Sequence, residues 1–359
     1  MGMARRILRK MTNSCQAACA KSVKHLGFIA ALLLCCPSRA SAAEWWQAGL
    51  NTNQPLWGLH GGLQFAIHPA GFRGATGGPR GLIRIGSPVL AQGRYDLVNF
   101  IAVEPVVKGR KGFSELEQSS LDQTKGKRIW AGAATNEEKP AASLQPGTIS
   151  RPTAGVDQLD VILRVEKFDN GAHVYLVVSQ RSDAPDEIQF TIHSEPGGAP
   201  MDYCILTATM GNMARARQLW LKDEMVSSLK LYPDYTGTGF AEHTLYPLSR
   251  LHVTPPGDIL VAITTDEENP AAVRPFPNSN LWYYGGSRVT QFWKKQKGGF
   301  REDLLVAVNA RFTYWQSVRP IPGGVAFENF ELRERFHEGQ RFIFGLTFKT
   351  PKELGFSAK

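Results

Sequence analysis

Hydrophobic and polar residues alternate along much of the chain after residue 42, with a period of two. Residues 159–165 show this most clearly, because Leu, Val, Leu and Val occupy every second position. Such alternation is typical of a strand with one buried face. Asn170-Gly171 follows and favours the positive φ angles of a tight turn, so residues 159–165 and 173–178 are predicted to form a β-hairpin. A turn at 183–186 leads to a third strand at 187–193.

The same alternation recurs up to the C-terminus, and segments rich in proline and glycine separate the runs. Further strands are predicted at residues 82–85, 97–103, 259–265, 289–294, 304–315, 325–336 and 341–348. The chain contains 35 glycines and 22 prolines, which suits many turns between short strands. The pattern therefore predicts an all-β fold, a large antiparallel two-sheet β-sandwich with few or no helices.

Two segments do not show this pattern clearly. Residues 210–229 fit either a helical apolar stripe or a strand alternation, and we prefer the strand. Residues 131–157 are polar, rich in Pro, Ala and Gly and without periodicity, which indicates a long loop or a linker. The strands predicted before residue 130 are too few to form a stable domain of their own. Residues 43–359 are therefore predicted to form a single large β-sandwich domain.

The first 42 residues differ in character from the rest. They contain seven Lys and Arg and no acidic residue, followed by an apolar run at 27–36 and by Ala40-Ser41-Ala42. This order is typical of a secretory signal peptide, so residues 1–42 are predicted to be removed from an exported protein, periplasmic or extracellular. The apolar run is shorter than the roughly 20 residues of a membrane-spanning helix, and no membrane span is expected. A signal that started at Met11 would have a more usual length.

Removal of this segment changes the charge and the cysteine content. Seven of the 41 Lys and Arg lie in residues 1–42, which leaves 34 cations against 32 Asp and Glu. A nearly neutral chain does not indicate a nucleic-acid partner, although the whole chain has a net charge of +9. Four of the five cysteines also leave. Cys204 remains in an apolar strand-like context, so it is expected to be a buried, inert thiol without a disulfide partner.

Sequence motifs of known chemistry are absent. The chain has no GxSxG elbow, phosphate loop, dinucleotide fingerprint, HExxH or calcium loop. No histidine beyond residue 42 has a second histidine or a cysteine at metal-ligand spacing, so neither a structural metal nor a cofactor is expected. Since sites in β-sandwiches assemble from distant strands, polar clusters become the candidates.

The first polar cluster is the segment 234–247, which combines glycines, aromatic rings, two carboxylates and a histidine. As a sugar-contacting loop, Tyr235 would stack on C–H faces and Asp234 would accept hydrogen bonds from hydroxyls. Glu242 or His243 would transfer a proton. The alternative is a surface loop held in place by its own tyrosines.

A second cluster holds three consecutive rings at 282–284. Neighbours in a strand point to opposite sides, so the three rings cannot all face one core. Trp282 and Tyr284 are therefore candidates for a carbohydrate platform, and the alternative is that they cover a sheet edge.

Arg215 and Arg217 alternate with small residues and are expected to point to the same side of a strand. Such a pair suits a substrate carboxylate, as in an acidic polysaccharide. A ladder of surface ion pairs is the alternative.

The last candidates are carboxylates in or beside predicted strands. Glu104 ends an apolar strand, where a carboxylate is either solvated or held by an arginine, and Glu115 and Glu117 point to the same side if their segment is extended. Glycosidic chemistry uses paired carboxylates, and the alternative is that these residues are structural or solvated. Glu328 and Glu331 flank Asn329-Phe330, and the alternation there indicates that one of them points inward, where it needs a partner.

Together these features predict a soluble exported protein that binds or modifies carbohydrate, with a poly- or oligosaccharide as partner. His243 would act as the acid and Glu242 or Glu328 as the base, which requires a carboxylate within about 8 Å of His243. The size is similar to that of the two-sheet sandwiches of sugar mutarotases and polysaccharide lyase domains, an analogy that no motif carries. The alternative is a non-catalytic structural or interaction protein of the cell envelope, with the rings as interface anchors.

Overall fold

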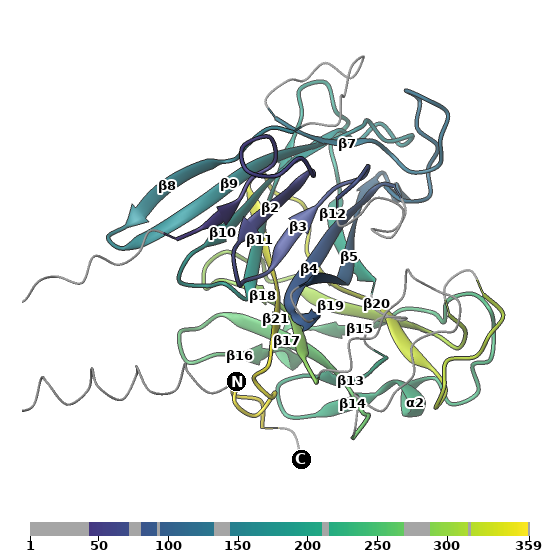
Figure 1. Ribbon diagram of the computed structural model, residues 1–359. Helices are drawn as coiled ribbons and strands as arrows, with labels where there is room; N and C mark the ends of the chain where they lie inside the picture. Colours follow the sequence, from purple (N-terminus) through teal and green to yellow (C-terminus); the bar gives the residue numbers. More distant parts are fainter. Residues whose placement is uncertain are drawn as a thin grey trace, which may run out of the picture. The chain divides into compact units, whose positions relative to one another are not determined.

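The computed structural model describes residues 43–71, 80–91, 94–132, 144–209, 215–268, 288–314 and 317–357 (Figure 1). Most of this part of the chain is β-strand, arranged in two sheets. Residues Ala42–Lys359 belong to one compact unit. The predicted signal peptide, 1–42, lies outside the described residues.

The first sheet has ten strands among the described residues, and its order is β1-β2-β3-β4-β5-β12-β20-β19-β15, with β6 paired to β5. Their bounds are β1 (Trp45–Trp46), β2 (Leu56–Leu59), β3 (Gln64–Ala66), β4 (Leu82–Ala91), β5 (Arg94–Val107), β6 (Arg110–Lys111), β12 (Tyr203–Thr209), β15 (Thr244–Pro247), β19 (Leu305–Arg311) and β20 (Ala326–Arg333).

The second sheet has eleven strands in the described part, in the order β14-β13-β17-β18-β21-β11-β10-β9-β7, with β16 paired to β17 and β8 to β9. The bounds are β7 (Ile129–Ala131), β8 (Thr148–Thr153), β9 (Val156–Val165), β10 (Val174–Arg181), β11 (Glu187–Ser194), β13 (Ala216–Trp220), β14 (Met225–Ser227), β16 (His252–Val253), β17 (Ile259–Thr265), β18 (Thr290–Lys295) and β21 (Gln340–Thr347). Adjacent strands run antiparallel in both sheets, as in the β9, β10 and β11 pairings.

The predicted antiparallel two-sheet β-sandwich is confirmed. Helical structure among the described residues is limited to α2 (Ser228–Leu231) and the 3₁₀ turn η2 (Leu248–Arg250). The segment 210–229, for which helix and strand competed, contains β13 and β14, and only its last two residues belong to α2.

The predicted hairpin is present as β9 and β10, with Val161 opposite Val178. The expected tight turn is present, because the Gly171 N–H donates to the Phe168 carbonyl and the Phe168 N–H donates to the Ala172 carbonyl, each at 2.9 Å. Gly171 adopts a positive φ of 89°, a conformation that glycine takes without steric cost. Asn170-Gly171 therefore marks the reversal of the chain, as predicted.

The core lies between the two sheets, because the buried apolar residues of both sheets belong to one contact cluster. Strand β9 shows the cause: Leu159, Val161 and Leu163 are buried and alternate with the partly exposed Asp160 and Ile162. Trp293 of β18 is fully buried in this core, and its Nε1 donates to the Phe330 carbonyl of β20 at 2.8 Å. Cys204 is also buried there, as expected, and burial raises the pKa of its thiol.

Polar side chains also cross the core from one sheet to the other. Asn99 of β5 donates through Nδ2 to Gln291 Oε1 of β18 at 2.7 Å. Gln340 of β21 donates to the Cys204 carbonyl of β12 at 3.1 Å. Buried polar groups need such partners, so each bond favours one alignment of the two sheets.

A buried ion pair adds a charged link. Lys295 at the end of β18 pairs with Glu334, which directly follows β20, and both side chains are 0% exposed. The Lys295 ammonium also lies 4.0 Å from the ring centre of Phe342. Burial lowers the pKa of Lys295, while the charge of Glu334 opposes this shift.

We expect Glu334→Gln to lower the free energy of unfolding by about 3–5 kcal/mol, because it leaves the buried Lys295 charge without a counter-charge. Lys294, the neighbouring residue, provides a matched control, since its ion pair with Glu187 is partly exposed. Lys294→Met should cost about 1 kcal/mol or less. Urea unfolding of both variants tests this, and equal losses would contradict the role given to Lys295 and Glu334.

Candidate functional site

Three glutamates gather at the face of the first sheet that points away from the core. Glu104 lies on β5 and Glu331 on β20, while β12 runs between them and contributes Thr207. Their strand neighbours, such as Val103 and Leu332, belong to the core. Because side chains alternate along a strand, the three polar residues are directed to the opposite face.

The third glutamate, Glu115, comes from the segment after β6. Ser114 bonds to both backbone groups of Val103: its N–H donates to the Val103 carbonyl at 3.1 Å, and its Oγ accepts from the Val103 N–H at 2.9 Å. These bonds hold the segment against β5, so that Glu115 comes close enough for the charge of Glu104 to affect it. We call Glu104, Glu115 and Glu331 the carboxylate cluster.

Thr207 links two members of the carboxylate cluster. Its Oγ1 contacts Glu104 Oε2 at 2.6 Å and also contacts Glu331 Oε2. A hydroxyl has one proton and can donate to one carboxylate only, so the second contact requires a proton on a carboxyl group. Glu104 and Glu331 therefore hold one proton between them.

The pKa directions indicate where this proton lies. Burial raises the pKa of Glu104, and the charge of Glu331 adds to the effect. Burial also disfavours the charged form of Glu331, but Arg333, Lys111, the bond from Thr207 and His243 together outweigh it and lower the pKa of Glu331. The neutral form is thus favoured at Glu104 and the ionised form at Glu331.

Two cations border the pair from the solvent side. Lys111 forms an ion pair with Glu104, and Arg333 donates through Nε to Glu331 Oε1 at 2.7 Å. Both cations are partly exposed, whereas both carboxyl groups are buried. The cations therefore compensate the buried charge without leaving water themselves.

Glu115 carries a second retained proton. Burial, followed by the charge of Glu104, raises its pKa to about 8. Its Oε2 has no hydrogen-bond partner in the part of the chain that the structure describes. The group is therefore a neutral carboxylic acid near pH 7.

His243 lies at the exposed end of this arrangement, one residue before β15. Its Nε2 is 3.7 Å from Glu331 Oε1, and its side chain is 30% exposed against 0% for Glu331. Burial lowers the pKa of His243, although the charge of Glu331 opposes this. A neutral imidazole beside an ionised carboxylate can accept a proton, and Glu331 can stabilise the imidazolium that results.

The predicted distance condition for acid/base chemistry is met by Glu331, which is not the residue expected to act as base. Glu242 is exposed, and its carbonyl accepts a hydrogen bond from the Tyr232 hydroxyl at 3.0 Å. Glu328 is buried in β20, next to the point where the pairing of β19 and β20 changes register. The charged groups that act on His243 are Glu331, Arg333 and Lys111.

The predicted sugar-contacting loop is held by its own aromatic residues. Asp234 is exposed, and Tyr235 is half-buried against the core. The Tyr235 hydroxyl lies over Gly237, where an added Cβ would approach it to 2.9 Å. Tyr232 bonds to the Val308 carbonyl at 3.1 Å and so ties the loop to β19.

Arg215 and Arg217 form internal ion pairs. Arg215 donates through Nη1 to Glu267 at 3.0 Å and through Nη2 to the Tyr314 hydroxyl at 3.0 Å. Arg217 donates to Asp266 at 2.9 Å. Both guanidinium groups are buried, so these ion pairs are internal and differ from the surface ladder given as the alternative.

Several expectations need separate mention. Trp282 and Tyr284 lie outside the described residues. Within the described ranges, no three His, Cys, Asp or Glu residues are placed to hold a metal ion. The helices of that part of the chain include none that is long and apolar enough to cross a membrane.

The sequence reasoning did not single out Thr207, Lys111 and Arg333. Arg333 could have been found, because it lies two positions after Glu331 and so on the same side of a strand. The signal for Thr207 depends on strand pairing, which is not visible in the sequence.

Comparison with known proteins gives little guidance. No family model matches the chain, and no curated protein matches it. It resembles the galactosidase domain of alpha-galactosidase-sucrose kinase AgaSK with a TM-score of 0.36 and 9% identity, over 87% of this chain and 43% of that one. It also resembles HI1317, with a TM-score of 0.23 and 11% identity, over 85% of this chain and 99% of that one. The chain thus spans less than half the length of the galactosidase chain, and such scores carry no functional conclusion.

The Glu115 carboxyl should make stability depend on pH. In the unfolded chain it titrates near 4.5 and in the folded protein at about 8, so between these values only the folded state holds the proton. The free energy of unfolding should therefore fall as pH rises from about 5 to about 8, and Glu115→Gln should remove this contribution. Urea unfolding across this range measures it.

Glu242→Gln is the control, because it removes a carboxylate that is exposed to water in both states. If the free energy of unfolding changes with pH equally in the wild type and in Glu115→Gln, the neutral state assigned to Glu115 is wrong.

Proposed function

We propose that this protein is exported and that it modifies a carbohydrate, with His243 and Glu331 transferring protons. The observation that carries the proposal is the pairing of a partly exposed imidazole with a fully buried, ionised carboxylate. A catalytic histidine needs both access to substrate and a fixed counter-charge, and this pair supplies the two together.

The surroundings of His243 suit a sugar. Leu245 follows two positions later and is 51% exposed, and Phe240 of the same segment is 42% exposed. Sugar rings have apolar C–H faces and polar edges, so exposed apolar groups beside a proton-transfer pair match both properties. His243 would take a proton from a sugar hydroxyl or an acidic C–H bond, and Arg333 would stabilise negative charge that develops on the substrate.

An interaction role in the cell envelope is the second candidate. It is favoured by the loop that contains His243, which is tied down by Tyr232 and Tyr235 rather than left open to a ligand. In that case the ionised pairs would serve stability alone.

Substitution of His243 separates the two. We expect His243→Ala to lower conversion in a saccharide screen by about a hundredfold or more, the usual contribution of a general acid or base. Glu331→Gln should also lower the rate, because it removes the charge that stabilises the imidazolium. The screen measures bond cleavage, elimination and anomer exchange on neutral and acidic saccharides.

His193 gives a matched control. It is also a partly exposed histidine paired with a glutamate, since its Nδ1 lies 2.6 Å from Glu338 Oε1. His193→Ala should leave conversion unchanged. A wild type that converts no saccharide, or a His243→Ala variant with full activity, would favour the interaction role.

The pH profile gives an independent test of the base. Activity should fall as pH is lowered through the pKa of His243, which burial places below its ordinary 6.5. A rate that does not fall at any acidic pH at which the protein stays folded would exclude His243 as the base.

Export is tested on the cell itself. The protein should be recovered outside the cytoplasm with its N-terminus after Ala42, as shown by fractionation and N-terminal sequencing. Deletion of the apolar residues 27–34 should retain the chain inside, and cytoplasmic wild-type protein with an intact N-terminus would contradict the proposal.

A further inference from the structure

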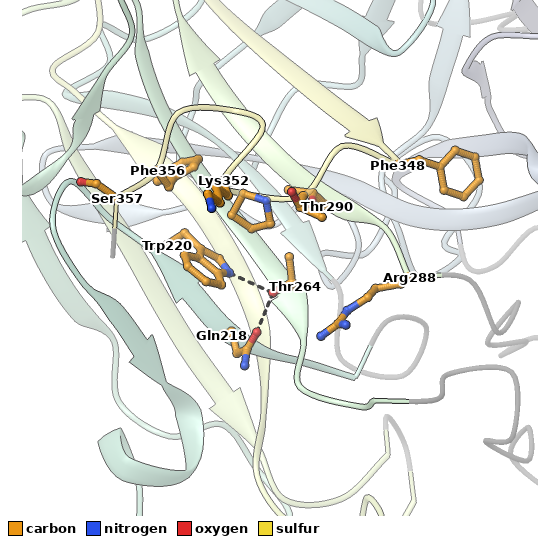
Figure 2. A pocket seen from close by; sticks show the side chains of 11 residues that line it. Gln218, Trp220, Thr264, Arg288, Thr290, Phe348, Lys352, Phe356 and Ser357 are labelled. Carbon is orange, nitrogen blue, oxygen red and sulfur yellow. Dashed lines mark hydrogen bonds between the residues drawn. The ribbon is translucent and has the colours of Figure 1, made fainter. Parts of the chain in front are cut away.

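A cavity of about 590 Å³ lies on the second sheet, where the chain after β21 crosses the ends of β13, β17 and β18 (Figure 2). This volume is in the range of small-molecule sites. The cavity shares no lining residue with the carboxylate cluster. Its walls are Gln218, Trp220, Thr264, Arg288, Thr290, Phe348, Thr350, Pro351, Lys352, Phe356 and Ser357.

A hydrogen-bond relay fixes the amide of Gln218. Trp220 Nε1 donates to Thr264 Oγ1 at 2.9 Å, and Thr264 Oγ1 contacts Gln218 Oε1 at 3.0 Å (Figure 2). An indole N–H can only donate, so the threonine hydroxyl accepts from it and gives its own proton to an acceptor. The amide oxygen must therefore face Thr264. Among the described residues, no hydrogen bond takes up the N–H groups of the Gln218 amide, so they can serve a ligand.

Positive charge accompanies these donors. Arg288 and Lys352 both line the cavity and are exposed, and no Asp or Glu is among its lining residues. The nearby Glu353 carboxylate is bonded to the Thr350 N–H at 2.7 Å. This part of the wall therefore favours an anion.

Acceptors for ligand hydroxyls are also present. The buried Thr290 hydroxyl donates its single proton to the Lys349 carbonyl at 2.7 Å. Its oxygen can then only accept, and a ligand O–H would suit it. The cavity thus pairs donors for an anionic group with an acceptor for a hydroxyl.

Aromatic rings complete the wall. Trp220 is half-buried and packs near Phe356, with ring centres 6.5 Å apart. Phe348 is 54% exposed at the rim. Such rings suit the C–H face of a pyranose.

We propose that this cavity binds an acidic saccharide of the uronic-acid class. The ligand carboxylate accepts from Gln218 Nε2 and lies near Arg288 and Lys352. A ring hydroxyl donates to Thr290, and a sugar face lies on Trp220. This assignment uses residues of the second sheet only and stands apart from the proton transfer assigned to His243.

Calorimetric titration of the full mature chain tests the site. The ligands are oligogalacturonate, a neutral galacto-oligosaccharide of the same length, and inorganic phosphate. Binding of the oligogalacturonate alone is the expected result. Equal binding of the neutral sugar overturns the proposal, because it shows that the acid group is not recognised. Equal binding of phosphate also overturns it, because it shows that the sugar is not recognised.

Gln218→Glu is the sharpest variant, because Oε1 still accepts from Thr264 while the donors are replaced by a charged oxygen. It should weaken uronate binding at least tenfold, and Arg288→Gln should do the same. Lys349→Gln is the control and should leave uronate binding unchanged, since Lys349 is an exposed cation that lies next to the cavity without lining it.

Thermal unfolding of each variant shows whether it is folded. Unchanged affinity in folded Gln218→Glu and Arg288→Gln overturns the site even if the wild type binds uronate. His243→Ala should bind uronate like the wild type, so failure here and failure of the proposed catalysis are separate results.

Discussion

The alignment of the two sheets across their common core is the constraint on which the other features depend. Trp293 and Asn99 each form a hydrogen bond from one sheet to the other inside this core. Side chains alternate with a period of two, so a shift of one residue in a strand would exchange its buried and its outward faces. A core that must satisfy these bonds accepts one register. In that register Glu104, Thr207 and Glu331 lie together on the outer face.

The candidate site costs stability that the core must offset. Burying carboxyl groups is unfavourable unless cations, hydrogen bonds or protonation compensate it. The carboxylate cluster uses all three: Lys111 and Arg333 pair with it, Thr207 bonds to two of its members, and Glu115 keeps its proton. An outer face with a purely structural role could consist of solvated residues, which would not carry this free-energy cost. This imbalance is typical of sites where perturbed groups have a chemical task, although ion-pair networks also produce it.

The fold class could be predicted because strand alternation is local. The strands at 159–165 and 259–265 can be predicted from neighbouring positions in the sequence, and each is a strand over those residues in the structure. The tight turn at Asn170-Gly171 is local in the same way, since the Gly171 N–H bonds to the Phe168 carbonyl three positions earlier.

The site could be predicted only in part. His243, Glu104 and Glu331 all attracted notice, but their meeting depends on the pairing of β12 with β5 and with β20. These strands come from distant parts of the chain, and no spacing along the sequence records their register. Sequence reasoning therefore preferred Glu242, which is adjacent to His243 but exposed, and Glu328, which is buried elsewhere on β20. Trp220 and Gln218 gave no signal as a ligand site, because their role follows from a chain segment more than a hundred residues later.

The single hydrogen of the Thr207 hydroxyl gives the carboxylate cluster an unusual property. Moving the shared hydrogen from Glu104 to Glu331, with rotation of the hydroxyl, reverses which carboxyl is charged while every carbon and oxygen atom keeps its place. The two forms would superimpose in electron density, yet their C=O stretching bands would differ in the infrared. The charge distribution of the site therefore depends on the position of one hydrogen, which scatters X-rays only weakly. Exchange of this hydrogen for deuterium in heavy water would shift the infrared bands and reveal it.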